Sequence, residues 1–253
     1  PRTFQVSATP LPAAWGEGVF GAILVLRDVT ELAQAMAVKT DFVASASHEL
    51  RTPVAALRAA LETLRDGADE DPAMRGRLLA MCERHAARLE EMTGDLLDLS
   101  RLESPEAPVT LEAVDVAEIT GTVIESIERT GVLGTRRLTV RAHVDEVLGP
   151  KGAVTSDRRL LDLILRNLLE NATKFAYEGT TIEVRWRAAR IGASEEPAGG
   201  TLRLEVQDRG PGIPLEQQER VFERFYQVDP ARTGFSAARG SGLGLAIVKH
   251  AAR

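Results

Sequence analysis

The sequence predicts two folded parts. The first is an all-α helical hairpin that forms a dimeric four-helix bundle, and the second is an α/β two-layer sandwich. Within residues 31–104, two stretches, 43–64 and 78–99, carry a seam of residues at alternating steps of four and three, and strand-like and helix-like patterns alternate over residues 105–253. A short strand-rich segment, residues 1–30, precedes both. A chain of 253 residues is long enough for more than one hydrophobic core.

Residues 1–30 read as strands and turns. Thr3–Ser7 alternates apolar and polar side chains, and Gly21–Leu26 is rich in branched apolar residues, which predicts a buried strand. Two or three strands do not form a stable domain alone. The chain begins at Pro1 without methionine and ends inside a helical pattern, so we expect a piece of a longer protein.

The helical hairpin follows from two apolar seams with heptad spacing. The first seam contains Val43, Ser47, Leu50, Val54, Leu57, Leu61 and Leu64. The second contains Leu78, Cys82, His85, Leu89, Met92, Leu96 and Leu99. Charged residues, Gly67 and Pro72 end the first helix between them. A hairpin with two such seams leaves apolar surface uncovered, and burying it in a four-helix bundle predicts a homodimer.

After a linker at Ser104–Pro108, the pattern of a mixed sheet with helices on one face begins. The expected strands are Val109–Val114, Leu138–Val144, Thr181–Arg187 and Leu202–Gln207, with a polar loop at Gly192–Gly200. The expected helices are Val116–Arg129 with Asp115 as N-cap, Asp157–Ala176, Leu215–Phe225 and Leu243–Ala252.

Composition excludes several classes of function. A net charge of −6 gives no general case for binding nucleic acid. The single cysteine, Cys82, rules out an internal disulfide. No apolar run approaches the roughly 20 residues that span a bilayer, so we expect no direct membrane contact in this chain.

The stretch from His48 to Pro53 reads HELRTP. His48 falls one position outside the seam, so it faces solvent on the flank of the bundle. Glu49 is suited to accept the Nδ1–H, which leaves the lone pair of Nε2 free. Thr52 lies one turn along the same face, and Pro53 is expected to bend the helix. A lone histidine is usually an ordinary surface residue, but these neighbours indicate a nucleophile.

Asn167 and Asn171 lie four residues apart on one face of the expected helix 157–176. Helix interiors disfavour asparagine, so the pair suggests a ligand. Their amide oxygens suit Mg²⁺ that carries a triphosphate. Lys174, one turn further, is placed to reach a phosphate. Taken alone, the same residues would also suit a solvated polar face.

Two glycine-rich motifs follow. Asp208, Gly210 and Gly212 form a DxGxG turn after a strand. The motif GSGLG opens the last helix with residues Gly240, Gly242, Leu243 and Gly244. Backbone N–H groups at such a helix start suit a triphosphate. The motif is neither a Walker nor a Rossmann sequence.

In this order the motifs resemble the catalytic core of a sensor histidine kinase of two-component signalling, over residues 31–253. The resemblance implies a Bergerat-type ATP-binding fold and ATP-dependent autophosphorylation of His48. The phosphoryl group would pass to an aspartate of a response-regulator receiver domain, with Glu49 and Thr52 also serving the reverse, phosphatase reaction. By the resemblance Asn171 is the Mg²⁺ ligand with Asn167 in support, and Asp208 accepts the adenine amino hydrogen.

The resemblance to sensor histidine kinases also extends to residues 1–30 and to residues 221–239. Residues 1–30 look like the last strands of a PAS sensor domain. The whole chain looks like the cytoplasmic portion of a longer protein, and the sequence leaves open whether that protein is anchored in a membrane. Val221–Tyr226 resembles the family's F motif, and Asp229–Arg239 its ATP lid. Gln227 stands where many similar kinases carry an arginine that contacts the γ-phosphate. That positive charge then has to come from elsewhere, and the candidates are Arg224, Arg232 and Arg239.

Two alternatives stay open from the sequence. One is a non-kinase ATPase of the gyrase or Hsp90 type, which the exposed His-Glu pair on a helical hairpin disfavours. The other is a signalling scaffold that dimerises without catalysis, which His48, Asn171 and Asp208 disfavour and Gln227 favours.

Overall fold

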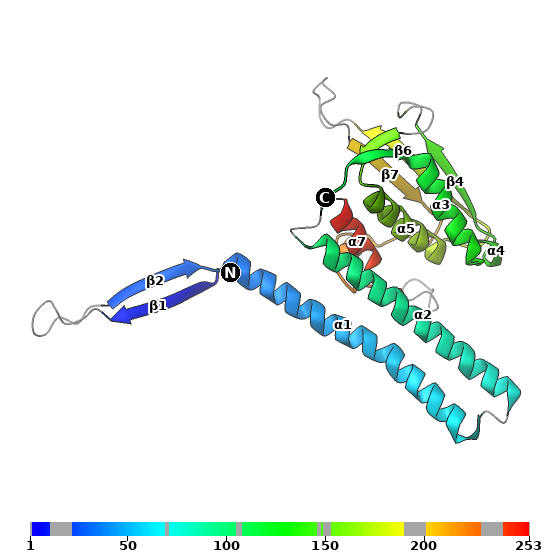
Figure 1. Ribbon diagram of the computed structural model, residues 1–253, viewed down its shortest axis with the longest axis horizontal. Helices are drawn as coiled ribbons and strands as arrows, with labels where there is room; N and C mark the ends of the chain where they lie inside the picture. The colour runs from blue at the N-terminus through cyan, green and yellow to red at the C-terminus, as the bar shows by residue number, and fades with distance from the viewer. Residues whose placement is uncertain are drawn as a thin grey trace, which may run out of the picture. The chain divides into compact units, whose positions relative to one another are not determined.

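A computed structural model describes residues 2–10, 22–68, 71–104, 108–145, 148, 153–189, 201–228 and 240–252 (Figure 1). The chain divides into two units, residues 1–52 and residues 53–253, and each is described by itself. The expected loop 192–200 and lid 229–239 lie outside the described residues. Among the described residues, no helix combines the length and the apolar character that crossing a bilayer requires.

The first unit begins with an antiparallel hairpin of β1 (Phe4–Pro10) and β2 (Ala22–Asp28). Every residue of β2 is exposed, so the expectation of a buried strand at Gly21–Leu26 is wrong for the described part, 22–26. A two-stranded ribbon has no second layer to cover its apolar side chains. Asp28 Oδ1 accepts hydrogen bonds from Thr30 N at 3.0 Å and Thr30 Oγ1 at 2.6 Å, which joins the hairpin to the following helix.

The predicted helical hairpin consists of α1 (Thr30–Thr63) and α2 (Pro72–Leu102), and the segment Leu64–Ala68 after α1 contains non-helical backbone angles at Asp66 and Gly67. The turn needs Gly67, whose φ of 105° lies in the region that favours glycine. Asp71 caps α2 by accepting a hydrogen bond from Ala73 N at 2.8 Å. The helix α1 continues through Pro53 to Thr63.

The rest of the second unit is a two-layer α/β arrangement. Strand β4 (Thr139–Val144) pairs in parallel with β6 (Thr181–Ala189), and β6 pairs antiparallel with β7 (Thr201–Gln207). A separate antiparallel pair joins β3 (Glu112–Asp115) to β5 (Ala153–Ser156). The helices are α3 (Val116–Arg129), the short α4 (Val132–Thr135), α5 (Arg158–Phe175) and α7 (Gly244–Ala251).

Helices α3 and α5 match the sequence expectations most closely. Asp115 caps α3 through bonds from Ala117 N and Glu118 N, and Asp157 caps α5 through a bond from Leu160 N at 3.1 Å. These caps satisfy backbone donors at the helix starts, which is why the local sequence sets these ends correctly.

Two expectations for this unit are wrong, and one strand was not expected. The strand expected at Val109–Val114 is only Glu112–Asp115. The helix expected at Leu215–Phe225 is two 3₁₀ turns, Leu215–Gln217 and Arg220–Phe222. Strand β5 was not expected, because four residues carry too little periodicity to identify a strand.

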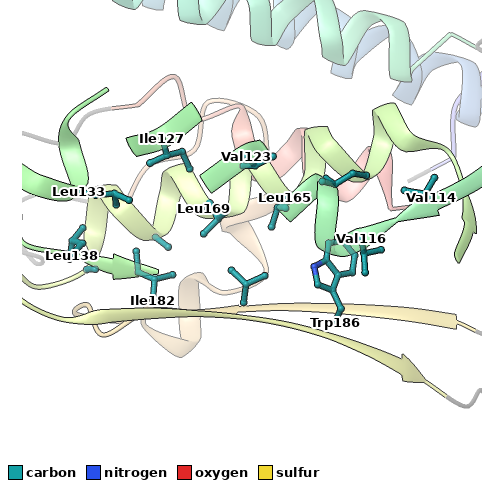
Figure 2. Packing of buried hydrophobic residues seen from close by; sticks show 14 residues of the cluster. Val114, Val116, Val123, Ile127, Leu133, Leu138, Leu165, Leu169, Ile182 and Trp186 are labelled. Atoms are coloured by element: carbon teal, nitrogen blue, oxygen red, sulfur yellow. The ribbon is translucent and has the colours of Figure 1, made fainter. Parts of the chain in front are cut away.

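The core of the second unit lies between the helices α3 and α5 and the sheet (Figure 2). Its buried residues are Val114, Val116, Ile119, Val123, Ile127, Leu133, Leu138, Leu165, Leu169, Ala172, Ala176, Ile182, Val184 and Trp186. On α5 the apolar residues recur every three to four positions, so one face of the helix packs on the sheet and its opposite flank is left for other contacts.

One polar contact is fixed inside this core. The indole Nε1 of Trp186 donates to Thr120 Oγ1 at 2.8 Å, and both residues are 1% exposed. The Thr120 hydroxyl in turn donates to Val116 O at 2.6 Å. The indole N–H therefore has its partner within the protein rather than in water.

We expect Thr120→Val to destabilise the protein by about 1–3 kcal/mol, because the buried indole N–H would lose its acceptor. The matched control is Thr122→Val, which makes the same chemical change on an exposed face of α3 and should cost less than about 0.5 kcal/mol. Urea unfolding of both variants measures the difference. Equal unfolding free energies would contradict the role of this hydrogen bond.

Candidate functional site

His48 lies on α1 in the first unit and is strongly exposed, with 76% of its side-chain surface accessible. Its Nδ1 is 4.0 Å from Glu49 Oε1, a distance at which charges interact but which exceeds that of a hydrogen bond. Thr52 is also exposed on this helix. A free imidazole with an adjacent carboxylate is therefore available to a large reaction partner.

The second unit contains a cavity of about 290 Å³. It lies at α5, the end of β7 with the following turn, and the segment before α7. Most residues of the predicted nucleotide site line it, namely Asn167, Asn171, Lys174, Asp208, Gly212, Gly240, Gly242 and Gly244. Three motifs that are far apart in the sequence thus meet at one cavity.

Helix α5 supplies four of the polar side chains of the cavity, those of Asn167, Glu170, Asn171 and Lys174. Asn167 is nearly buried, and its Nδ2 donates to Leu163 O at 2.9 Å. The C-terminal end of α5 is held by Arg136, whose guanidinium donates to Lys174 O at 2.8 Å and Ala176 O at 2.6 Å. Cations near a helix C-terminus satisfy its last carbonyls, so Arg136 fixes the turn that carries Lys174.

The glycines allow the segments to approach closely. A Cβ on Gly244 would lie 2.7 Å from Asn167 Oδ1, and a Cβ on Gly210 would lie 2.5 Å from Phe175 O. Gly242 has a φ of 73°, and its carbonyl accepts a hydrogen bond from Phe225 N at 2.8 Å. Side chains at Gly244 and Gly210 would push these segments away from α5, and a side chain at Gly242 would collide with the backbone of Phe225.

Three predicted site residues do not line the cavity. Gly210 packs closely against Phe175 O, and Leu243 is fully buried. Arg224 instead forms an ion pair with Glu103 at the end of α2. Gln227, which lines the cavity, donates from Nε2 to Gly240 O at 2.8 Å. The other two arginine candidates, Arg232 and Arg239, lie outside the described residues.

Several lining residues were not predicted as site residues. Glu170 and Ser241 lie within the predicted motifs, so the motifs themselves could have indicated them. Glu91 and Asp95 come from α2, where they appeared as ordinary charged positions of a helix. Helix α2 contacts α7, which brings these two carboxylates to the cavity.

Burial raises the pKa of Asp95 to about 6 from its ordinary 3.8. The charges of Glu91 and Glu170 raise it further, while the hydrogen bond from Ser241 and the charge of Lys174 oppose the rise. Burial likewise raises the pKa of Glu170, with Lys174 opposing. Both of these carboxyl groups of the cavity therefore ionise less readily than they would in water.

The raised pKa makes the stability of the second unit depend on pH. The folded protein binds a proton at Asp95 more tightly than the unfolded chain, so the stabilisation is present below about pH 4 and is lost as the pH rises through about 6. We expect the wild type to gain unfolding free energy over Asp95→Asn as the pH falls from about 7 to about 5. Urea midpoints of both proteins across this range measure the difference. A difference that does not vary with pH would contradict the assignment to Asp95.

Comparisons with known proteins cover both parts of the chain. Residues 38–105 match the family described as His Kinase A (phospho-acceptor) domain. Residues 156–253 match the family described as histidine kinase-, DNA gyrase B-, and HSP90-like ATPase. His48 falls in the first match, and the polar side chains of α5 and both glycine motifs fall in the second.

Among relatives, the sensor-like histidine kinase SenX3 of Mycolicibacterium smegmatis is 38% identical over 231 residues, which are 91% of this chain and 56% of that protein. The chain spans about half the length of this curated relative. A structure of full-length ShkA in complex with AMPPNP is 27% identical with a TM-score of 0.54, and the match covers 82% of this chain and 39% of that chain. A structure of histidine kinase ThkA in complex with the response regulator TrrA shares the fold, with a TM-score of 0.61 at 20% identity, and the match covers 94% of this chain and 69% of that chain.

Proposed function

Because residues 38–105 and 156–253 form the catalytic core of a sensor histidine kinase, we propose that the chain binds ATP in the cavity of the second unit and phosphorylates His48. The phosphoryl group then passes to an aspartate of a response-regulator receiver domain. The observation that carries the proposal is the meeting of the asparagine helix, the DxGxG turn and the GSGLG segment at one cavity.

In the proposed reaction the lone pair of His48 Nε2 attacks the γ-phosphorus of ATP. The bond from that phosphorus to the bridging oxygen breaks, ADP leaves, and an N–P bond forms. Positive charge grows on the ring as it does so, and the carboxylate of Glu49, 4.0 Å from Nδ1, stabilises it. The exposure of the imidazole supports this role, because the ring needs no rearrangement of α1 to be reached.

The residues of the cavity fit Mg²⁺ brought by the nucleotide. Mg²⁺ takes oxygen ligands and keeps several waters, and one or two protein oxygens with phosphate oxygens suffice. Among the described residues no group of three or more histidine, cysteine, aspartate or glutamate side chains could hold a metal ion, so the phosphates would have to supply part of the shell. Asn171 would hold the ion with Asn167 in support, and Mg²⁺ would neutralise the charge that develops on the phosphates.

Other residues of the cavity would contact the adenine base and the phosphates of ATP. Asp208 lines the cavity and would accept the adenine amino hydrogen, which selects adenine over guanine. Lys174 and the N–H groups at Gly240–Gly244 would hold the phosphates. Arg224 would supply charge to the γ-phosphate only after leaving its ion pair with Glu103.

We also propose that the chain acts as a homodimer. On the helical hairpin Val54, Leu61, Leu79 and Leu97 are exposed in the single chain, and a four-helix bundle would cover such residues. Thr52, exposed on α1, is proposed to orient water when the response regulator is dephosphorylated. The PAS-like nature of residues 1–30 and the domain limits at 31–104 and 105–253 stay predictions.

The test is incubation of the chain with Mg²⁺ and γ-labelled ATP. We expect a covalent label on the protein that is stable in alkali and lost in acid, as a phosphohistidine is. Release of labelled phosphate without labelled protein would favour the plain ATPase. Absence of ATP binding would favour the scaffold, and either result would overturn the proposal.

A further inference from the structure

Among the residues that the structure describes, helix α2 and its C-cap residue Glu103 form several ion pairs and hydrogen bonds with the ATPase part of the second unit. Glu91 Oε1 is 2.8 Å from Lys174 Nζ, Ser241 Oγ donates to Asp95 Oδ2 at 2.5 Å, and Glu103 pairs with Arg224. We call these three pairs the α2 contact. In each of them α2 provides the carboxylate and the ATPase part provides the cation or the donor.

Two of the three pairs lie inside the cavity itself. Glu91 and Asp95 are four residues apart, so they lie on one face of α2, and both line the cavity. Their partners belong to the elements that would bind phosphates. Lys174 is the proposed phosphate cation, and Ser241 is part of the GSGLG segment, where its Oγ also accepts from Leu243 N at 3.1 Å.

A carboxylate and a phosphate present the same chemistry to such groups. Each offers anionic oxygens to an ammonium or a hydroxyl group. Lys174 carries a single ammonium group, so a carboxylate and a phosphate would compete for it. Carboxylates of Glu91, Asp95 and Glu170 at the cavity would also repel a triphosphate. Lys174 and Ser241 therefore cannot bind the carboxylates of α2 and the phosphates of a nucleotide at the same time unless α2 moves away.

We propose that the α2 contact is autoinhibitory, with Glu91 and Asp95 occupying the positions that the triphosphate of ATP needs. Binding of ATP and docking of α2 then oppose each other, and by linkage each weakens the other to the same degree. The inference rests on the proposed function, because it takes Lys174 and the GSGLG segment as phosphate-binding groups. It adds a regulated step, since any signal that moves α2 would alter access of ATP to the cavity.

The test compares nucleotide affinity of the whole chain with that of the variant Glu91→Gln/Asp95→Asn. These changes keep the side-chain size and remove two negative charges. We expect the variant to bind the non-hydrolysable analogue AMPPNP with Mg²⁺ about threefold to tenfold more tightly, a range that two partly exposed polar pairs would give. Adenosine has no phosphates, so its affinity should not change.

The matched control is Glu90→Gln/Asp98→Asn, which removes the same charges from α2 at residues that do not line the cavity. It should leave both affinities as in the wild type. A second readout is amide hydrogen exchange of residues 89–99, which AMPPNP should accelerate in the wild type and much less in the variant.

The affinities for AMPPNP and adenosine distinguish a failure of the autoinhibitory contact from a failure of the proposed function. Equal AMPPNP affinity of wild type and variant, or an equal gain in adenosine affinity, would overturn the autoinhibitory contact and leave the proposed function standing. If neither protein bound AMPPNP, the nucleotide pocket itself would be refuted, and both proposals with it. Melting curves of the variant and the control show whether both fold as the wild type does.

Discussion

We expect His48→Ala to abolish phosphoryl labelling of the chain by γ-labelled ATP. Without the imidazole no group on this face of α1 offers a nitrogen lone pair, and the label should fall to background. Binding of ATP should remain as in the wild type, because His48 is on α1 and the cavity lining comes from α2 and the ATPase part. Scintillation counting of the purified protein and a binding titration with ATP measure the two effects.

The matched control is His143→Ala, which removes an exposed histidine from β4. This variant should be labelled like the wild type. Acid-labile label persisting in His48→Ala, or lost in His143→Ala, would contradict the assignment of the acceptor. Loss of ATP binding in His48→Ala would also contradict it, because the imidazole would then serve the cavity and not the acceptor step.

The second large effect is expected for Asn171→Ala. If Asn171 holds the Mg²⁺ that neutralises charge on the phosphates, its removal should lower the rate of labelling by on the order of a hundredfold or more. The loss should appear with Mg²⁺-ATP, whereas adenosine should bind as in the wild type, since adenosine brings no phosphates to a metal ion. Initial rates of labelling and titrations with both compounds measure this difference.

A comparison variant separates metal binding from general damage to the helix. Asn171→Gln keeps the amide but moves its oxygen by one methylene, and should restore little activity because Mg²⁺ demands near-ideal octahedral geometry. Labelling at the wild-type rate in Asn171→Ala would refute the metal ligand. Equal losses of ATP and adenosine binding would show that the change had disturbed the cavity as a whole.

Much of the fold could be predicted from the sequence because it depends on local chemistry. The caps Asp115 and Asp157 set the starts of α3 and α5, and the spacing of apolar residues set their buried faces. The confirmed identification as a sensor histidine kinase core likewise rests on short motifs whose residues stand near one another in the chain.

The predictions of secondary structure were wrong or incomplete where the local sequence pattern is short or weak. The stretch 215–225 carries apolar residues at helical spacing but forms only two 3₁₀ turns, because tertiary contacts override such weak propensity. Strand β5 depends on its pairing with β3, which begins at Glu112, 41 residues before the first residue of β5, Ala153. Such a partner cannot be read from four residues.

The sequence by itself determined which groups are available for chemistry: an imidazole beside a carboxylate, two asparagines and a lysine on one helix face, and two glycine motifs. Only the tertiary structure decided what these groups contact. It paired Lys174 with Glu91, Ser241 with Asp95 and Arg224 with Glu103, across separations of 83, 146 and 121 residues. Periodicity and capping act within a few residues, whereas contacts at these separations exist only once α2 packs on the ATPase part.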